Sequence, residues 1–144
     1  MRDENYPSSV DEVLDSAVCF RPVALRAVRR FSRSEPWRGT LVERWQKIQR
    51  FNRALAAAYG IEPPMLILRG NGKGDSGASC YVPLLHTIIL RGRLSVVTFL
   101  HEFAHARGMG EQRACRWSLN LFRRCFSKSW KKIQYDDHVV RAVE

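Results

Sequence analysis

The sequence contains no hydrophobic run long enough to cross a membrane. Its longest apolar stretch, LSVVTFL at residues 94–100, is followed directly by His101 and Glu102, whereas a membrane-spanning helix needs about 18–20 apolar residues. The first residues, MRDENYPSSVDEV, are polar and acidic and lack the basic start and apolar centre of a secretory signal. We therefore expect a cytoplasmic protein that makes no membrane contact.

Cysteine is scarce, and its spacing excludes paired-thiol modules. The four cysteines are Cys19, Cys80, Cys115 and Cys125, and no two of them form a CxxC pair. Scattered cysteines in a reducing cytosol are typical of buried thiols rather than of a disulfide framework. Cys115 lies close in sequence to a histidine pair, so a thiolate metal ligand is an alternative role for it.

Acidic residues are also few, with 14 Asp and Glu against 24 Lys and Arg and a net charge of +10. Residues 21–53 hold ten basic side chains against Glu35 and Glu43, and residues 107–132 hold eight against Glu111 alone. Such a surface attracts nucleic acid or an acidic protein. Because no nucleic-acid-binding motif accompanies the charge, a solvated arginine-rich face is an equally good interpretation.

Apolar periodicity and turn residues predict an α+β fold, with helices packed on a short sheet. The predicted helices span about residues 9–18, 21–31, 39–60, 94–107 and 111–126, and the predicted strands span residues 65–70 and 87–90. The length fits one domain over residues 1–144, with residues 1–8 and about 136–144 expected to be flexible tails.

A glycine-rich segment, GNGKGDSG at residues 70–77, separates the two predicted strands. It lacks the GxxxxGK[ST] order of a phosphate-binding loop, so we interpret it as a hairpin connection. Pro83 indicates an edge position or a bend before the second strand.

The segment TFLHEFAHARG at residues 98–108 has the spacing of a helical zinc site. Apolar residues recur at i, i+3, i+4 and i+7 from Val96, which predicts a packed helix. On that helix His101 and His105 lie one turn apart and can bind one metal ion at roughly 2.0–2.1 Å. Glu102 projects about 100° around the helix, too far to be a ligand in the same plane, but it can reach a metal-bound water as general base.

A catalytic zinc site needs a third protein ligand, and Glu111 is the first candidate. Gly108 suits the left-handed turn that ends a helix, and such a turn would let the chain double back and direct Glu111 at the metal. The alternative is that His101 and His105 are core histidines and that Glu111 stabilises the first turn of the next helix.

The run LSVVTFLHEFAHARG resembles the active-site half of a zincin metallopeptidase. The following EQRACRWSLNLF is similar to the glutamate helix of the small bacterial ImmA/IrrE-type gluzincins, and the resemblance covers roughly residues 62–126. It implies a zincin-like fold in which Glu111 is the third ligand, with Ala114 packed beneath the site. Trp117 and Ser118 would fill the aromatic and small positions of that helix.

The ligand spacing differs from that of most gluzincins, since only five residues separate His105 from Glu111. This gap equals the HExxHxxGxxH/D spacing of metzincins, but no methionine follows Met109 to form their Met-turn. His138 is therefore an alternative third ligand, as in SprT-type proteases, which place a third histidine farther along the chain.

The resemblance implies a zinc-dependent metallopeptidase that hydrolyses a protein or peptide, with zinc as cofactor and Glu102 as general base. Residues Thr87, Ile88, Ile89 and Leu90 are predicted to form the edge strand that aligns the substrate. Tyr81, Tyr135 or His138 are the candidates for stabilising the oxyanion. The alternative is a non-catalytic, metal-containing basic module that binds nucleic acid or a protein partner.

Overall fold

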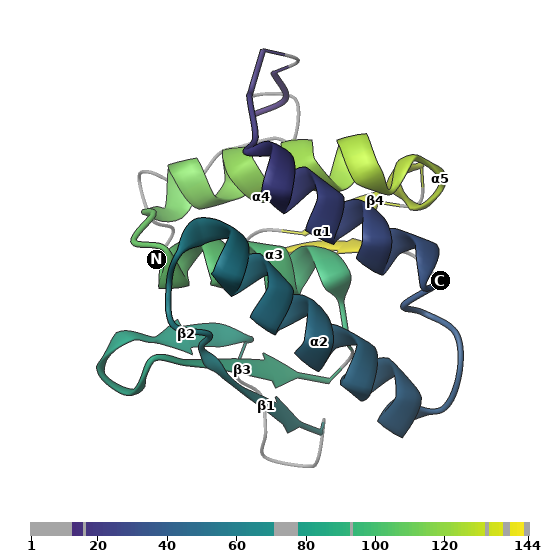
Figure 1. Ribbon diagram of the computed structural model, residues 1–144, viewed down its shortest axis with the longest axis vertical. Helices are drawn as coiled ribbons and strands as arrows, with labels where there is room; N and C mark the ends of the chain where they lie inside the picture. Colours follow the sequence, from purple (N-terminus) through teal and green to yellow (C-terminus); the bar gives the residue numbers. More distant parts are fainter. Residues whose placement is uncertain are drawn as a thin grey trace.

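The computed structural model describes residues 13–15, 17–70, 78–92, 94–131, 133–136 and 139–142, with side chains described up to residue 131. The described chain forms an α+β fold (Figure 1). Its elements are α1 (Pro22–Arg33), α2 (Leu41–Tyr59), β1 (Met65–Arg69), β2 (Cys80–Val82), η1 (Pro83–Leu85), β3 (Thr87–Arg91), α3 (Val96–Ala106), α4 (Glu111–Cys125), α5 (Ser127–Trp130), β4 (Ile133–Asp136) and β5 (Val139–Ala142).

The three-stranded sheet has the order β1-β3-β2, so Thr87–Arg91 forms its central strand. β3 pairs in parallel with β1 and antiparallel with β2. The prediction that residues 87–90 form an edge strand is therefore wrong. Thr87, Ile88 and Leu90 are buried, and a β-branched, apolar run of this kind suits a strand with neighbours on both sides.

The connection between β1 and β2 is not a hairpin, because β3 lies between these two strands. A parallel partner for β1 requires the chain to cross over before it returns. Residues 71–77 of the predicted hairpin loop lie outside the described residues. Pro83 begins the short 3-10 turn η1, so its predicted role as a bend is confirmed.

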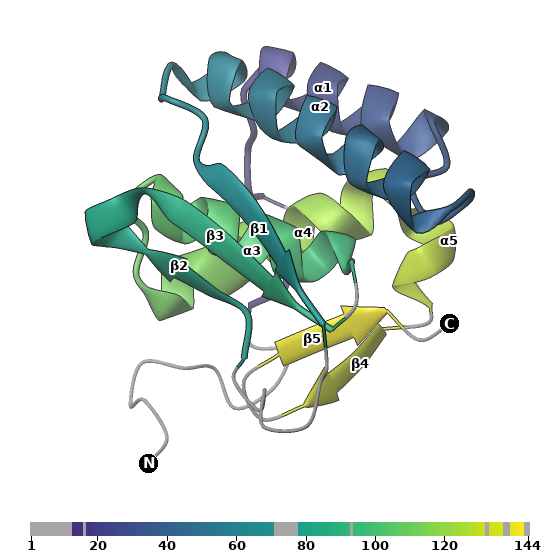
Figure 2. The same ribbon diagram turned by 90° about the horizontal axis from the view of Figure 1, so that it is seen from below.

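α1 and α2 form an antiparallel pair of helices (Figure 2), and α1 also packs against α4. A capping box fixes the start of α2: the Thr40 side chain accepts from the Glu43 backbone N–H and the Glu43 side chain accepts from the Thr40 backbone N–H. Gly60 ends the helix in the left-handed conformation, with φ of 66°, a region that glycine enters without strain. Both predicted boundaries of this helix are confirmed.

The hydrophobic core is centred on α3, which lies between the sheet and α4 (Figures 1 and 2). Phe99, Leu100 and Phe103 are fully buried on α3, and Leu121 is fully buried on α4. Since α3 is packed on both sides, its position is fixed by the fold, and so is the position of any side chain that it carries.

The segment before α1 is not helical over the described residues 13–15 and 17–18, which corrects the predicted helix at 9–18. Its backbone is held by Asn120 of α4, whose side chain donates to the Val13 carbonyl at 2.7 Å and accepts from the Asp15 backbone N–H at 2.9 Å. A buried amide that bonds the backbone in this way competes with helix formation.

The predicted flexible tail from about residue 136 onward instead contains strand β5 and follows strand β4, which ends at Asp136. β4 and β5 form an antiparallel pair in which Asp136 pairs with Val139, and β5 lies against α3. The valine-rich sequence of this segment has the composition that strands prefer. In the described part of the chain, no helix is long and apolar enough to span a membrane.

Candidate metal centre

The two histidines and the glutamate come from consecutive helices joined by a short turn. α3 carries His101 and His105 and ends at Ala106, after which Gly108 adopts φ of 90°. The Met109 backbone N–H donates to the carbonyl of Ala104 at 3.1 Å, which closes the turn. Glu111 is the first residue of α4, so the predicted reversal of the chain at Gly108 is confirmed.

This reversal brings three ligand atoms together at the end of α3. The Nε2 atoms of His101 and His105 lie 3.1 Å apart, and those atoms lie 3.3 Å and 2.6 Å from the two carboxylate oxygens of Glu111. A tetrahedral zinc ion with bonds of roughly 2.0–2.1 Å separates its ligand atoms by about 3.3 Å. The three side chains therefore fit a single small cation once the closest pair, His105 and Glu111, moves apart by about 0.7 Å.

Hydrogen bonds within this trio shift the pKa of Glu111 and the pKa of His105. Hydrogen bonds from His101 and His105 hold the pKa of Glu111 far below its usual range. The bond to Glu111 raises the pKa of His105, burial opposes that rise, and the Met109 carbonyl adds to it. The carboxylate thus stabilises positive charge between the imidazoles, where a cation would otherwise sit.

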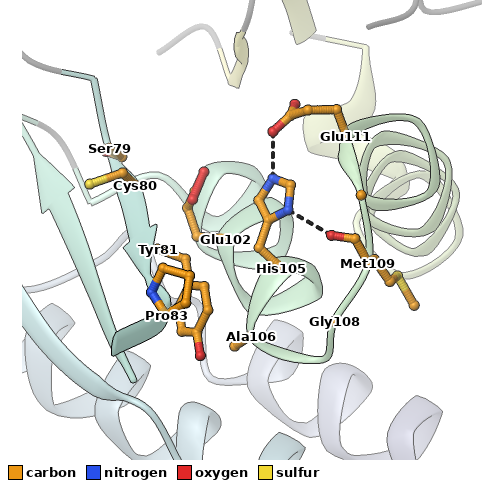
Figure 3. Close-up of a pocket in the computed structure, with 11 residues that line it drawn as sticks. Ser79, Cys80, Tyr81, Pro83, Glu102, His105, Ala106, Gly108, Met109 and Glu111 are labelled. Atoms are coloured by element: carbon orange, nitrogen blue, oxygen red, sulfur yellow. Dashed lines mark hydrogen bonds and ion pairs between the residues drawn. The ribbon is translucent and has the colours of Figure 1, made fainter. Parts of the chain in front are cut away.

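The second nitrogen of His105 is held by the backbone. Its Nδ1 donates to the Met109 carbonyl at 2.8 Å (Figure 3). A donor at Nδ1 orients the ring and directs Nε2 to the ligand cluster, as the outer hydrogen bonds of metal-bound histidines do. Sequence patterns offered no signal for this bond, because it is made by main-chain atoms.

Cys115 lies behind His101, with its sulfur 3.7 Å from Nδ1. Glu111 lies beside the other ring nitrogen, Nε2. His101, Glu111 and Cys115 are close enough to form a metal-binding group. The Cys115 sulfur could bind the same ion as Glu111 only if His101 bound that ion through Nδ1 instead of Nε2. The geometry therefore favours a role for Cys115 in packing against the His101 ring.

Glu102 lies beside the trio and is buried, with an exposed fraction of 7%. Its nearest carboxylate oxygen is 4.0 Å from Nε2 of His101, and it accepts a hydrogen bond from the backbone N–H of Tyr81. Burial raises the pKa of Glu102, while the two histidines and the Tyr81 N–H oppose the rise. A carboxylate with a raised pKa is suited to exchanging protons near neutral pH.

An open pocket of about 660 Å³ gives access to these groups. Glu102, His105 and Glu111 face it from α3 and α4, and β2 borders it with Cys80 and Tyr81 (Figure 3). The sheet edge beside the site is thus β2, which pairs only with β3 among the described strands. The sequence did not predict this role for β2 because strand order depends on pairing between distant segments.

None of the three predicted oxyanion candidates is placed at the centre by the described residues. The hydroxyl of Tyr81 lies 2.8 Å from Nδ1 of His86, whose Nε2 donates to the Glu62 carbonyl at 2.6 Å. The Tyr81 hydroxyl is therefore engaged away from the trio, and His86 links Tyr81 to the Glu62 backbone. His138 lies outside the described residues, as does the side chain of Tyr135.

Comparisons with protein-family models, with curated proteins and with solved structures find no match to this chain.

Proposed function

We propose that the chain is a zinc-dependent metallopeptidase with a zincin-like fold, most similar to the small bacterial ImmA/IrrE-type gluzincins. The observation that carries the proposal is the meeting of three side chains that can bind a metal, His101, His105 and Glu111, beside a buried Glu102 at an open pocket. A structural zinc site is closed by four protein ligands and needs no adjacent carboxylate. The open arrangement is the one that a catalytic site requires.

The donor set favours zinc over harder cations. Two imidazole nitrogens and one carboxylate suit zinc, whereas magnesium and calcium prefer sites made of oxygen ligands. Bound to His101, His105 and Glu111, zinc would supply Lewis acidity, polarising a carbonyl and lowering the pKa of a water molecule.

Glu102 would act as the general base. Its carboxylate borders the pocket, so it can accept a proton from a water molecule there and deliver it to the leaving amine. Because burial raises its pKa, the protonated form needed for the second transfer is accessible. The Tyr81 N–H would keep the carboxylate aimed at the pocket.

The substrate would be a protein or peptide in extended conformation. We infer that it pairs with β2 in place of the predicted 87–90 segment, because β2 has an unpaired edge among the described strands and borders the pocket. Backbone hydrogen bonds to an edge strand align a peptide independently of its side chains.

Metal content per chain, measured by native mass spectrometry, tests the ligand set. We expect one zinc in the wild type, loss of zinc in Glu111→Gln, and retention in Glu62→Gln, an exposed glutamate away from the trio. His138→Ala and Cys115→Ser test the two alternative ligands and should retain zinc. A folded wild type that takes up no zinc would remove the basis of the proposal.

Hydrolysis of labelled casein tests the catalytic role. Glu102→Gln should keep its zinc and lose cleavage by at least 100-fold, as expected for removal of a general base. Equal cleavage by the two zinc-loaded proteins would exclude Glu102 as the base. Zinc binding with no hydrolysis of folded, unfolded or peptide substrates would favour the non-catalytic basic module.

A further inference from the structure

The exposed side of α1 is almost entirely arginine. From its second turn onward, every exposed residue of this helix is an arginine: Arg26, Arg29, Arg30 and Arg33. They follow the i, i+3, i+4, i+7 spacing of a single helical face, and the buried residues Ala24, Val28 and Phe31 form the opposite face. The apolar face is already used in the core, so this helix is not a membrane-binding amphipathic helix.

The exposed side of α4 has the same composition. Its exposed residues are Gln112, Arg113, Arg116 and Arg124. Among the described residues, one exposed arginine of these two helices forms an ion pair with a carboxylate: Arg116 pairs with Asp15. The arginines of α1 and α4 therefore have few carboxylates to neutralise them.

The two faces meet at the C-terminal ends of the helices. Ser32 of α1 donates to the Cys125 carbonyl of α4 at 3.0 Å, and Phe31 contacts Phe126 edge-on at 6.2 Å between ring centroids. Burial raises the pKa of Cys125, and the positive charges of Arg29 and Arg124 oppose the rise. One arginine from each helix thus lies at the seam.

We call Arg26, Arg29, Arg30, Arg33, Arg113, Arg116 and Arg124 the arginine surface. Planar guanidinium groups bind phosphate with paired hydrogen bonds. The arginines extend over about 10 Å of α1, from Arg26 to Arg33, and over about 16 Å of α4, from Arg113 to Arg124. Each of these lengths spans several phosphates of a duplex. No exposed aromatic residue lies on these two helices, although single-strand binding relies on base stacking.

We propose that the arginine surface binds the phosphate backbone of a nucleic-acid duplex without reading its sequence. Base readout needs side chains such as Asn or Gln at base edges, and Gln112 is the one uncharged polar side chain exposed on α1 or α4. The proposal is independent of the metal centre, since none of the seven arginines contributes to the trio.

The test is fluorescence anisotropy with a labelled duplex of about 20 base pairs, at about 50 and 200 mM salt. The variant Arg30→Glu reverses one charge on α1, and Arg124→Glu reverses one charge on α4. Arg69→Glu is the matched control, because it changes net charge equally and lies on β1, in the sheet on the other side of α3 from α4 (Figure 1). Circular dichroism confirms folding, and Arg30→Gln and Arg124→Gln serve if a reversal unfolds the chain.

We expect wild-type affinity to fall on the order of a hundredfold between the two salt concentrations, as about four neutralised phosphates predict. Each surface variant should bind at least fivefold more weakly and lower the salt slope by about one, while Arg69→Glu stays within about twofold. Equal weakening by all three variants would overturn the proposal, since only net charge would then matter. Tight binding of polyglutamate without duplex binding would overturn it in favour of an acidic protein partner.

Discussion

The candidate metal centre and the arginine surface use charge in opposite ways. At the centre, His101, His105 and Glu111 lie within 3.3 Å of one another and are partly buried. On the surface, arginines repeat along two helices and are exposed to solvent. The three ligands meet at one point only if the fold places each of their atoms, whereas a row of exposed arginines needs only a helix. A single substitution at the centre should therefore abolish metal binding. Each substitution on the arginine surface should weaken duplex binding only in part.

The largest expected effect comes from the packing beneath the histidines. Leu100 is fully buried on α3, and Leu100→Ala should lower the free energy of unfolding by about 2–5 kcal/mol, measured by urea denaturation. Zinc affinity should fall too, because the helix that presents both histidines loses its support. Val23→Ala, half-exposed at the start of α1, should change unfolding by less than about 0.5 kcal/mol.

A shift in pH should separate the two regions. Because the hydrogen bond to Glu111 raises the pKa of His105, its imidazole keeps a proton to a higher pH than an ordinary histidine when no metal is bound. Zinc must displace that proton. Zinc affinity should therefore decrease by about tenfold for each pH unit below the raised pKa, as expected for one proton, and should level off above it. Arginine stays charged throughout, so duplex binding should not change between about pH 6 and 8. Parallel changes in both affinities would contradict this separation.

The turn between the helices can be strained without altering either helix. Gly108 has φ of 90°, whereas Gly110 has φ of −74°, and an added Cβ meets no atom within 4 Å at either position. Gly108→Ala should cost about 1 kcal/mol through backbone strain and weaken zinc binding by displacing Glu111. Gly110→Ala should change the stability and the zinc affinity by less than Gly108→Ala does. Calorimetric zinc titration distinguishes them, and equal effects would exclude the left-handed conformation as the cause.

The smallest effect is expected on the surface. Arg26→Ala removes one exposed charge from α1 and should alter unfolding by less than about 0.5 kcal/mol, while it lowers the salt slope of duplex binding by about one. Thermal melts and anisotropy measure the two quantities on one preparation. A large loss of stability would show that Arg26 has a packing role.

The parts of the site that depend on local sequence were predictable. Apolar periodicity located α3, and Gly108 located its end, since a left-handed turn and a helix stop are properties of a few adjacent residues. The meeting of Glu111 with the histidines followed from that turn. The zincin-like family and the catalytic activity stay predictions.

The parts that depend on distant segments were not predictable. The position of β3 at the centre of the sheet is set by pairing with β1 and β2, and a strand's own composition does not specify its neighbours. Asn120 holds Val13 across 107 residues of sequence. No local pattern reports a contact of that kind, so the segment before α1 was wrongly predicted as helical.

The turn from Ala106 to Gly110 acts as a spacer of fixed length. The Met109 carbonyl accepts a hydrogen bond from Nδ1 of His105, and Glu111, the first residue after the turn, contacts Nε2 of His105. Adding or deleting one residue in this turn would displace Glu111 relative to His105 by up to about 3.8 Å, the spacing of consecutive Cα atoms, which is enough to break both contacts. Natural variation in this protein should therefore include substitutions within the turn but no change in its length. Distant relatives can be sought by the pattern HExxH followed by five residues and a glutamate.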